Sequence, residues 1–151
     1  MTRLVLLDAG PIGLLTRSPR IPEAAACYAW LRAQLASGAR VLLPEIADYE
    51  VRRELLRLQA PAALRRLDAL HHETVYLPLT TPVMQRAAEL WAQVQQAGIP
   101  TADPQALDGD VILAAQALAV PQPADTFVIA TTNVGHLSRL VSAARWQDIG
   151  T

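Results

Sequence analysis

Hydrophobic positions along the chain fall into short runs separated by longer mixed segments. The run from Leu4 to Leu7 is wholly apolar, as is typical of a strand buried on both faces of a parallel sheet. The longer segments begin with helix-starting residues such as Pro22 and Pro44 and end at glycines such as Gly38. Because strand and helix patterns alternate from end to end, the sequence predicts an α/β fold with helices covering both faces of a mainly parallel sheet.

The alternation predicts one domain over residues 1–151, because it contains no internal repeat and no linker-like stretch. The predicted strands span residues 4–7, 40–43, 74–79 and 126–131, with a short fifth strand at 146–149. The predicted helices span residues 12–15, 22–37, 45–58, 61–71, 81–97, 104–119 and 134–144. The helix at 104–119 has an alternative start near residue 108. A central sheet of four to five strands is therefore expected.

Composition favours a folded domain without a strong overall charge. Hydrophobic residues make up 52% and charged residues only 18%, which argues against disorder. The net charge is −1, so binding to a nucleic acid would depend on a local basic patch. All 13 basic residues are arginine, whose planar guanidinium grips phosphate well.

The single cysteine and the N-terminal segment indicate in which compartment the protein is expected. Cys27 cannot form an internal disulfide, lies in an apolar run and is expected in the core, and a structural zinc site lacks the thiols it would need. The apolar run before Asp8 is too short for a signal peptide. No apolar segment reaches the roughly 18 residues that span a membrane. We therefore expect a soluble, cytoplasmic protein with no membrane partner.

Three acids occupy positions where strands and helices meet. Asp8 ends the first strand, and Asp110 leads directly into a wholly apolar helical run. Glu50 shares a helical stripe with the apolar Ile46, which draws its carboxylate inward. Ligands of open α/β sheets bind at the carboxyl ends of the strands, so these acids are expected to gather there. For Asp8, capping of the following helix is an equally weighted alternative.

Three clustered carboxylates predict a cation site and a class of chemistry. Their mutual repulsion is relieved best by a hard divalent ion such as Mg²⁺ or Mn²⁺, which prefers oxygen ligands. A metal held in this way activates water and stabilises charge on a phosphodiester. The acids therefore predict metal-dependent phosphodiester hydrolysis.

The remaining acids have plainer interpretations. Glu45, Asp48 and Glu54 are expected on a solvated helix face. Asp108 cannot share the face of Asp110, because two helical steps turn by about 200°. It is interpreted as an N-cap or an outer acid of the site, and Asp103 as a helix cap.

Four segments in order carry motifs of a known family. They are Leu-Val-Leu-Leu-Asp-Ala-Gly-Pro at 4–11, Leu-Pro-Glu-Ile-Ala-Asp-Tyr-Glu-Val at 43–51, Asp-Val-Ile-Leu-Ala-Ala-Gln-Ala at 110–117 and Val-Ile-Ala-Thr-Thr-Asn-Val-Gly-His-Leu at 128–137. Together they resemble the PIN-domain ribonucleases, especially the VapC-like toxins of bacterial toxin–antitoxin pairs. The third segment resembles its motif most strongly.

The resemblance implies a three-layer α/β/α fold and an endoribonuclease. Asp8, Glu50 and Asp110 would be the metal ligands, and Asn133 would help to position the water. Relatives are usually homodimers that cut RNA and are restrained by a small antitoxin protein, and the same partners are expected here.

Two departures from the family pattern leave an alternative open. Asn133 stands where many relatives have Asp, and Ala9 stands where many have Thr or Ser. A degenerate PIN domain that binds RNA or a protein partner without cleavage is therefore the second hypothesis. The segment 119–126 also looks longer than usual and is expected at the opposite edge of the sheet.

Several arginine, threonine and histidine residues near the motifs are candidates for binding or for a structural role. Five arginines crowd two consecutive helices and form either a surface for phosphate or antitoxin, or an ordinary solvated face: Arg52, Arg53, Arg57, Arg65 and Arg66. Thr131 and Thr132 end the fourth strand and are candidates to bind a phosphate. His136 is expected to be structural, and the helix-ending pair His71 and His72 is assigned no chemistry.

Overall fold

The computed structural model describes residues 3–98, 104–120, 126–135 and 137–151. Within these ranges a single sheet has five strands in the order β3-β2-β1-β4-β5, and every pairing is parallel. The strands are β1 (Leu4–Leu7), β2 (Arg40–Pro44), β3 (Val75–Leu77), β4 (Phe127–Thr131) and β5 (Ala143–Arg145). The expected parallel sheet is thus confirmed.

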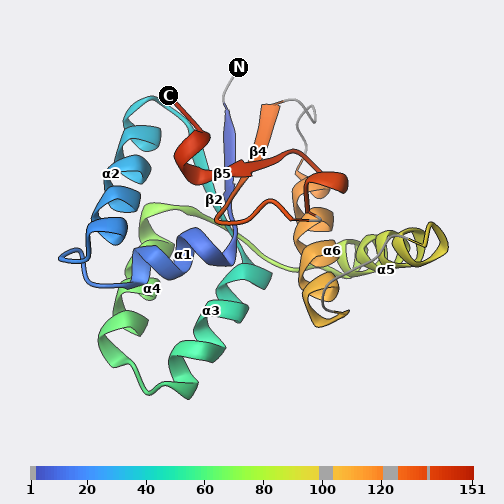
Figure 1. The fold of residues 1–151 in the computed structure, drawn as a ribbon, viewed down its shortest axis with the longest axis horizontal. Coiled ribbons are helices and arrows are strands. Elements are labelled where there is room, and N and C mark those ends of the chain that lie inside the picture. The colour runs from blue at the N-terminus through green and yellow to red at the C-terminus, as the bar shows by residue number, and fades with distance from the viewer. Residues whose placement is uncertain (1–2, 99–103, 121–125, 136) are drawn as a thin grey trace.

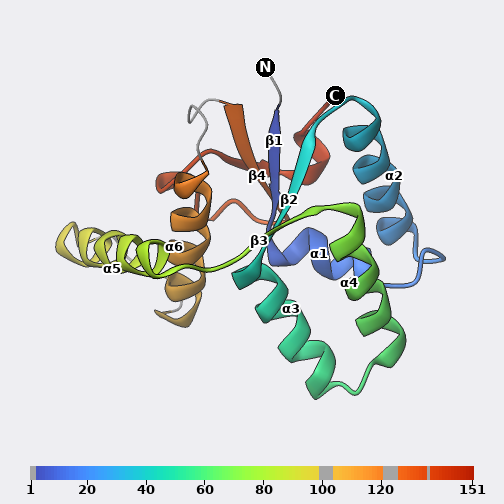
Figure 2. The same cartoon turned by 180° about the vertical axis from the view of Figure 1, so that it is seen from behind.

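Helices cover both faces of this sheet, as Figures 1 and 2 show from opposite sides. They are α1 (Ala9–Thr16), α2 (Pro22–Ala36), α3 (Glu45–Arg57), α4 (Pro61–Glu73), α5 (Thr81–Gln96) and α6 (Pro104–Ala119). Successive side chains of β1 pack alternately into two hydrophobic cores, one on each face of the sheet. Leu4 and Leu6 pack with α5 and α6, whereas Val5 and Leu7 pack with α1, α2 and α4. This confirms the three-layer α/β/α architecture.

The order of the strands creates a crevice at the middle of the sheet. From β1 the chain moves outward to β2 and β3, and then it crosses to β4 on the other side of β1. Leu4 is accordingly paired with Arg40 on one side and Phe127 on the other. Because the strand order reverses between β1 and β4, their carboxyl ends flank the position where open α/β sheets bind ligands.

The C-terminal part of the chain differs from its prediction. The expected helix at 134–144 is wrong, because Gly135 turns the chain at φ 41° and only a short 3-10 helix, η2 (Leu137–Arg139), follows. Residues 143–145 instead form β5 along β4. The strand expected at 146–149 is occupied by the 3-10 helix η3 (Trp146–Asp148). Edge pairing with the sheet outweighs the helix preference of alanine here.

Several smaller expectations are settled as well. Helix α1 begins at Ala9, earlier than the expected residue 12, and α6 begins at Pro104, so its later alternative start is wrong. Cys27 is fully buried in the core. No helix in the described ranges is long and apolar enough to cross a membrane. Asp103, His136 and most of the segment 119–126 lie outside the described residues.

Candidate metal site

Asp8 lies at the carboxyl end of β1 with both carboxylate oxygens engaged. Its Oδ1 accepts a hydrogen bond from the backbone N–H of Ala9 at 2.7 Å, and its Oδ2 accepts one from the Thr131 hydroxyl at 2.8 Å. Asp8 therefore caps α1 and faces β4 at the same time, so its interpretation as a helix cap is confirmed and its role as a metal ligand stays a prediction. Burial raises the pKa of Asp8, while these two hydrogen bonds oppose the rise.

Thr131 connects Asp8 to the loop that follows β4. Its side chain is almost fully buried, with 2% exposed, and its hydroxyl lies 3.2 Å from the Asn133 nitrogen and 3.1 Å from the Asn133 carbonyl oxygen. Thr131 therefore orients Asp8, and its contact with a phosphate stays a prediction. In the sequence, the only indication of this role is the position of Thr131 at the end of an apolar strand.

The first turn of α1 approaches the same loop very closely. A β-carbon on Gly10 would lie 2.3 Å from the Thr132 hydroxyl oxygen, far inside contact distance. Position 10 therefore requires glycine, since any side chain would push α1 and its capping Asp8 away from β4.

Glu50 projects from α3 with its carboxylate half-buried, as its place beside Ile46 predicted. Burial is the largest cause that raises its pKa, and the negative charges of Asp8 and Asp110 raise it further. Only Arg53 acts in the opposite direction among the causes of the shift. The three acids from β1, α3 and α6 thus share one electrostatic environment.

The negative charges of these acids would favour a bound cation, although the acids are not yet arranged as the ligands of one ion. Carboxylates held together against burial and mutual repulsion are stabilised by a hard divalent ion. Across the described ranges, however, no three Asp, Glu, His or Cys side chains are already grouped tightly enough to ligate one ion. A shared ion would have to bring the carboxylates closer together than they lie here.

Asn133 is exposed and takes part in a local turn. Its carboxamide oxygen accepts a hydrogen bond from the Gly135 N–H at 3.0 Å. One acceptor position of the oxygen is thereby occupied, and its role in orienting a water molecule stays a prediction.

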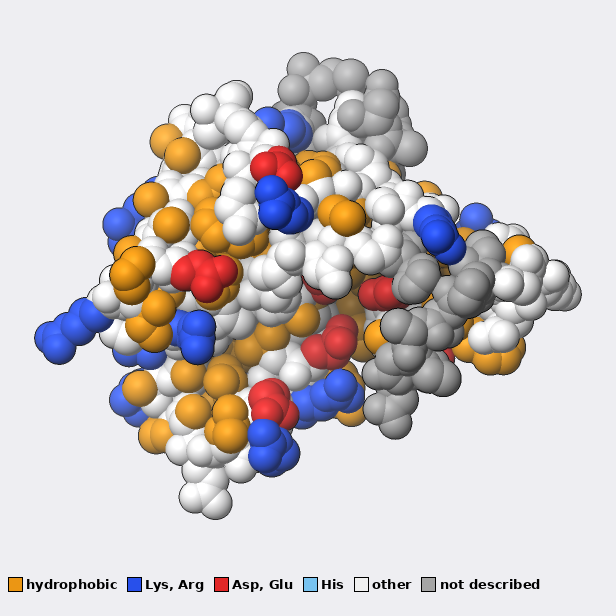
Figure 3. All heavy atoms as spheres, viewed as in Figure 1, with side chains coloured by type: hydrophobic (Ala, Val, Ile, Leu, Met, Phe, Trp, Pro, Cys, Tyr) orange, Lys and Arg blue, Asp and Glu red, His pale blue; other side chains and the backbone are white. Residues whose placement is uncertain are grey.

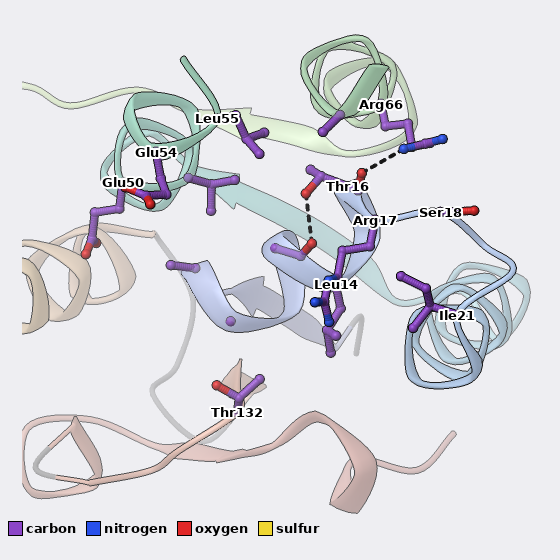
Figure 4. Close-up of a pocket in the computed structure, with 15 residues that line it drawn as sticks. Leu14, Thr16, Arg17, Ser18, Ile21, Glu50, Glu54, Leu55, Arg66 and Thr132 are labelled. Carbon is purple, nitrogen blue, oxygen red and sulfur yellow. Dashed lines mark hydrogen bonds between the residues drawn. The ribbon is translucent and has the colours of Figure 1, made fainter. Parts of the chain in front are cut away.

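A cavity of about 640 Å³ extends from Glu50 along α1. Glu50 and Glu54 lie at one end and Arg66 at the other, as the close-up in Figure 4 shows. Its floor is mainly apolar, with Leu14 among the lining residues. On this side of the molecule, Figure 3 shows acidic side chains gathered in a hollow near the centre. Of the three proposed site acids, Glu50 is the one that lines this cavity.

Four of the five arginines of α3 and α4 have contacts with other parts of the chain. Arg52 and Arg57 form ion pairs with acids, and the Arg53 guanidinium lies 5.0 Å from the centre of an aromatic ring. Arg66 donates to the carbonyl oxygen of Thr16 at 3.1 Å and, of the five, is the arginine that lines the cavity.

Asp48 contradicts its prediction of a solvated position. It is 7% exposed, accepts hydrogen bonds from Arg52, and lies 2.8 Å from His71 Nε2. Glu54 is exposed as expected, whereas Glu45 is half-buried and accepts a hydrogen bond from a backbone N–H in the chain after β3. Asp108 lies within α6 on its exposed side, so its interpretation as an N-cap is wrong.

Two solved structures share this fold over almost their whole length. A chain of the VapBC2 structure from Rickettsia felis, bound to a DNA fragment from their promoter, has a TM-score of 0.71 and 15% sequence identity. The match covers 95% of this chain and 98% of that one. The chain has the PIN-domain fold. VapBC-1 from nontypeable Haemophilus influenzae gives a TM-score of 0.69 at 16% identity, covering 96% of this chain and 99% of that one.

The PIN-domain fold is recognisable here from structure and not from overall sequence similarity. No protein-family profile matches the chain, and a search of curated proteins found no match. The resemblance that four short motifs indicated is therefore confirmed at the level of the fold.

Proposed function

We propose that this PIN domain is a metal-dependent endoribonuclease of the VapC-like toxin class, which hydrolyses RNA phosphodiester bonds. The observation that carries the proposal is the shared environment of Asp8, Glu50 and Asp110 at the switch point of the sheet. The raised pKa of Glu50, to which burial and both other acids contribute, is what an empty cation site would produce.

In this proposal the three carboxylates hold Mg²⁺ or Mn²⁺. A divalent ion supplies an activated water and neutralises charge on the phosphodiester when it is bound. Thr131 and the Ala9 N–H fix the orientation of Asp8, so one ligand is held in place before binding. Asn133 helps to position the water. The cavity beside Glu50 admits the RNA strand, with Arg66 and Arg17 available to its phosphates.

A small antitoxin protein is the proposed partner. Both solved relatives are VapBC structures, and their fold matches this chain over nearly its full length. Homodimer formation and a cytoplasmic location stay predictions from the sequence.

Substitution of a proposed ligand tests the activity directly. Asp110→Asn keeps the size of the side chain but removes its charge, so we expect metal-dependent cleavage of RNA to fall at least about 1,000-fold while the fold is retained. Cleavage is measured with purified protein and Mn²⁺, and circular dichroism checks the fold. Asp148→Asn is the matched control, because Asp148 of η3 is exposed and pairs with Arg145 of β5. Equal cleavage by Asp110→Asn and the parent would show that the site is assigned wrongly.

The second candidate is a PIN domain that binds RNA or a protein partner without cutting. Its support is the Asn133 oxygen tied into a turn, together with Ala9 in place of a hydroxyl residue. Calorimetric titration with Mn²⁺ separates the two functions. Heat from binding at or below millimolar Mn²⁺ supports the nuclease, and its absence supports the binding domain.

A further inference from the structure

Gly109 occupies an unusual position inside α6. It is an interior residue of the helix Pro104–Ala119, directly before Asp110. Apart from proline, glycine is the least favourable residue for a helix interior. Its φ angle is not in the left-handed region, so backbone conformation does not require glycine here.

The space beside Gly109 is filled by the carboxylate of Glu50. A β-carbon at position 109 would lie 3.2 Å from Oε1, 3.2 Å from Oε2 and 3.4 Å from Cδ of Glu50. Both oxygens are equally close, so the carboxylate group lies against the backbone of α6. Figure 4 shows Glu50 extending away from α3 toward this neighbouring helix.

A buried glutamine fixes the two helices at this crossing. Gln116 is fully buried, its Oε1 accepts from the Ile46 N–H at 3.2 Å, and its Nε2 donates to the Leu77 carbonyl at 2.8 Å. Gln116 lies two helical turns after Gly109, and Ile46 lies one turn before Glu50. The hydrogen bonds of Gln116 therefore resist any separation of α3 from α6. A side chain added at position 109 would be accommodated by movement of the Glu50 carboxylate.

We infer that Gly109 is a positioning residue for Glu50: the missing side chain lets the carboxylate lie against α6 beside Asp110. The inference rests on the proposed metal site, because the need to place a metal ligand explains why glycine, a poor helix former, stands at position 109. The inference also predicts that a substitution at position 109 has opposite effects on helix stability and on metal affinity. A side chain at position 109 improves the helix but displaces a metal ligand.

Calorimetry with Mn²⁺ and thermal unfolding of the metal-free protein measure these two effects separately. We expect Gly109→Ala to raise the Tm of the metal-free protein by about 2–4 °C. The same substitution should raise the Kd for Mn²⁺ by about 10-fold, and Gly109→Leu by about 100-fold, as is typical when the support of a ligand is lost.

Gly13→Ala is the matched control. Gly13 is also inside a helix, α1, and a β-carbon there meets no atom within 4 Å. It should raise the Tm by a similar amount and leave the Kd for Mn²⁺ unchanged. If both alanine variants weakened Mn²⁺ binding equally, the specific role of Gly109 would be refuted.

Glu50→Gln separates failure of this inference from failure of the metal site. If Glu50→Gln removes Mn²⁺ binding while Gly109→Ala and Gly109→Leu bind as the parent does, Gly109 is not a positioning residue. If the parent binds no Mn²⁺, or Glu50→Gln binds as tightly as the parent, the metal site itself is wrong. Loss of binding by Glu50→Gln with graded weakening at position 109 supports both.

Discussion

Glu50 and Asp8 are held in surroundings that favour their protonated forms. For both, burial is the largest cause of the raised pKa, and for Glu50 the neighbouring acids add to it. In the folded state each group holds its proton more tightly than in the unfolded chain. Stability of the metal-free protein therefore falls as pH rises from the unfolded pKa, about 4, through the folded pKa of each group. At neutral pH both acids therefore make an unfavourable contribution to folding.

Neutralising Glu50 should consequently stabilise the metal-free protein. We expect Glu50→Gln to raise the Tm at pH 7.5 by about 2–4 °C, the shift that roughly 1 kcal/mol gives in a domain of this size. Below about pH 4 the gain should disappear, because Glu50 is then protonated in both states. Scanning calorimetry across pH measures this, with Glu89→Gln on the exposed face of α5 as a control. A lower Tm for Glu50→Gln at pH 7.5 would contradict the assigned environment.

For single residues, the sequence indicated which acids would influence one another, but not the contacts that hold them. Asp8, Glu50 and Asp110 could be chosen because strand ends and apolar helix faces are visible in the hydrophobic pattern. The hydrogen bond from Thr131 to Asp8 joins residues 123 positions apart, and the contact of Gly109 with Glu50 joins two helices. Such contacts depend on tertiary packing, which periodicity does not encode.

The helices α3 and α4 are fastened together by one buried acid. Asp48 accepts hydrogen bonds from Arg52 on its own helix and lies 2.8 Å from His71 on α4, which in turn stacks on Tyr76 of β3. Burial would raise the pKa of Asp48, but the bonds from Arg52 and His71 outweigh it and hold the pKa below its usual range. Because α3 also carries Glu50, this network keeps the metal-site helix in place.

Asp48→Asn should destabilise the protein while a nearby control does not. We expect a loss of about 1.5–3 kcal/mol in the free energy of unfolding at pH 7, because hydrogen bonds to a charged, buried group are lost. Asp68→Asn also removes a partner of Arg52, but Asp68 is largely exposed, so a change below about 1 kcal/mol is expected. Urea unfolding measures both. The difference between parent and Asp48→Asn should shrink below about pH 4, as pH falls through the lowered pKa of Asp48. Equal losses for the two variants would contradict this account.

Elements with clear hydrophobic runs and terminal signals were predicted within a few residues. The C-terminal segment was not, because its alanine-rich sequence around Ala143 reads as helix. Its strand conformation comes from pairing with Ile129 and its neighbours on β4, which supply backbone partners. Propensity is a weak guide wherever a sheet edge competes for the same residues.

For the whole molecule, the metal site should couple ligand binding to global stability. An ion that binds only the folded state stabilises it by about 2.7 kcal/mol at a hundredfold excess over its Kd. We therefore expect Mn²⁺ at this excess to raise the Tm of the parent protein by about 5–10 °C. Asp110→Asn should show no such shift in the same thermal melts. A similar rise in both proteins would indicate that Mn²⁺ acts elsewhere on the chain.

The pairing of β1 with β4 also has a consequence for folding during synthesis. During synthesis, Asp8 leaves the ribosome more than a hundred residues before the Thr131 that orients it. A growing polypeptide that still lacks β4 cannot complete the middle of its sheet. If the proposed nuclease site is correct, its Asp8 reaches its final orientation only once β4 has been made and has paired with β1.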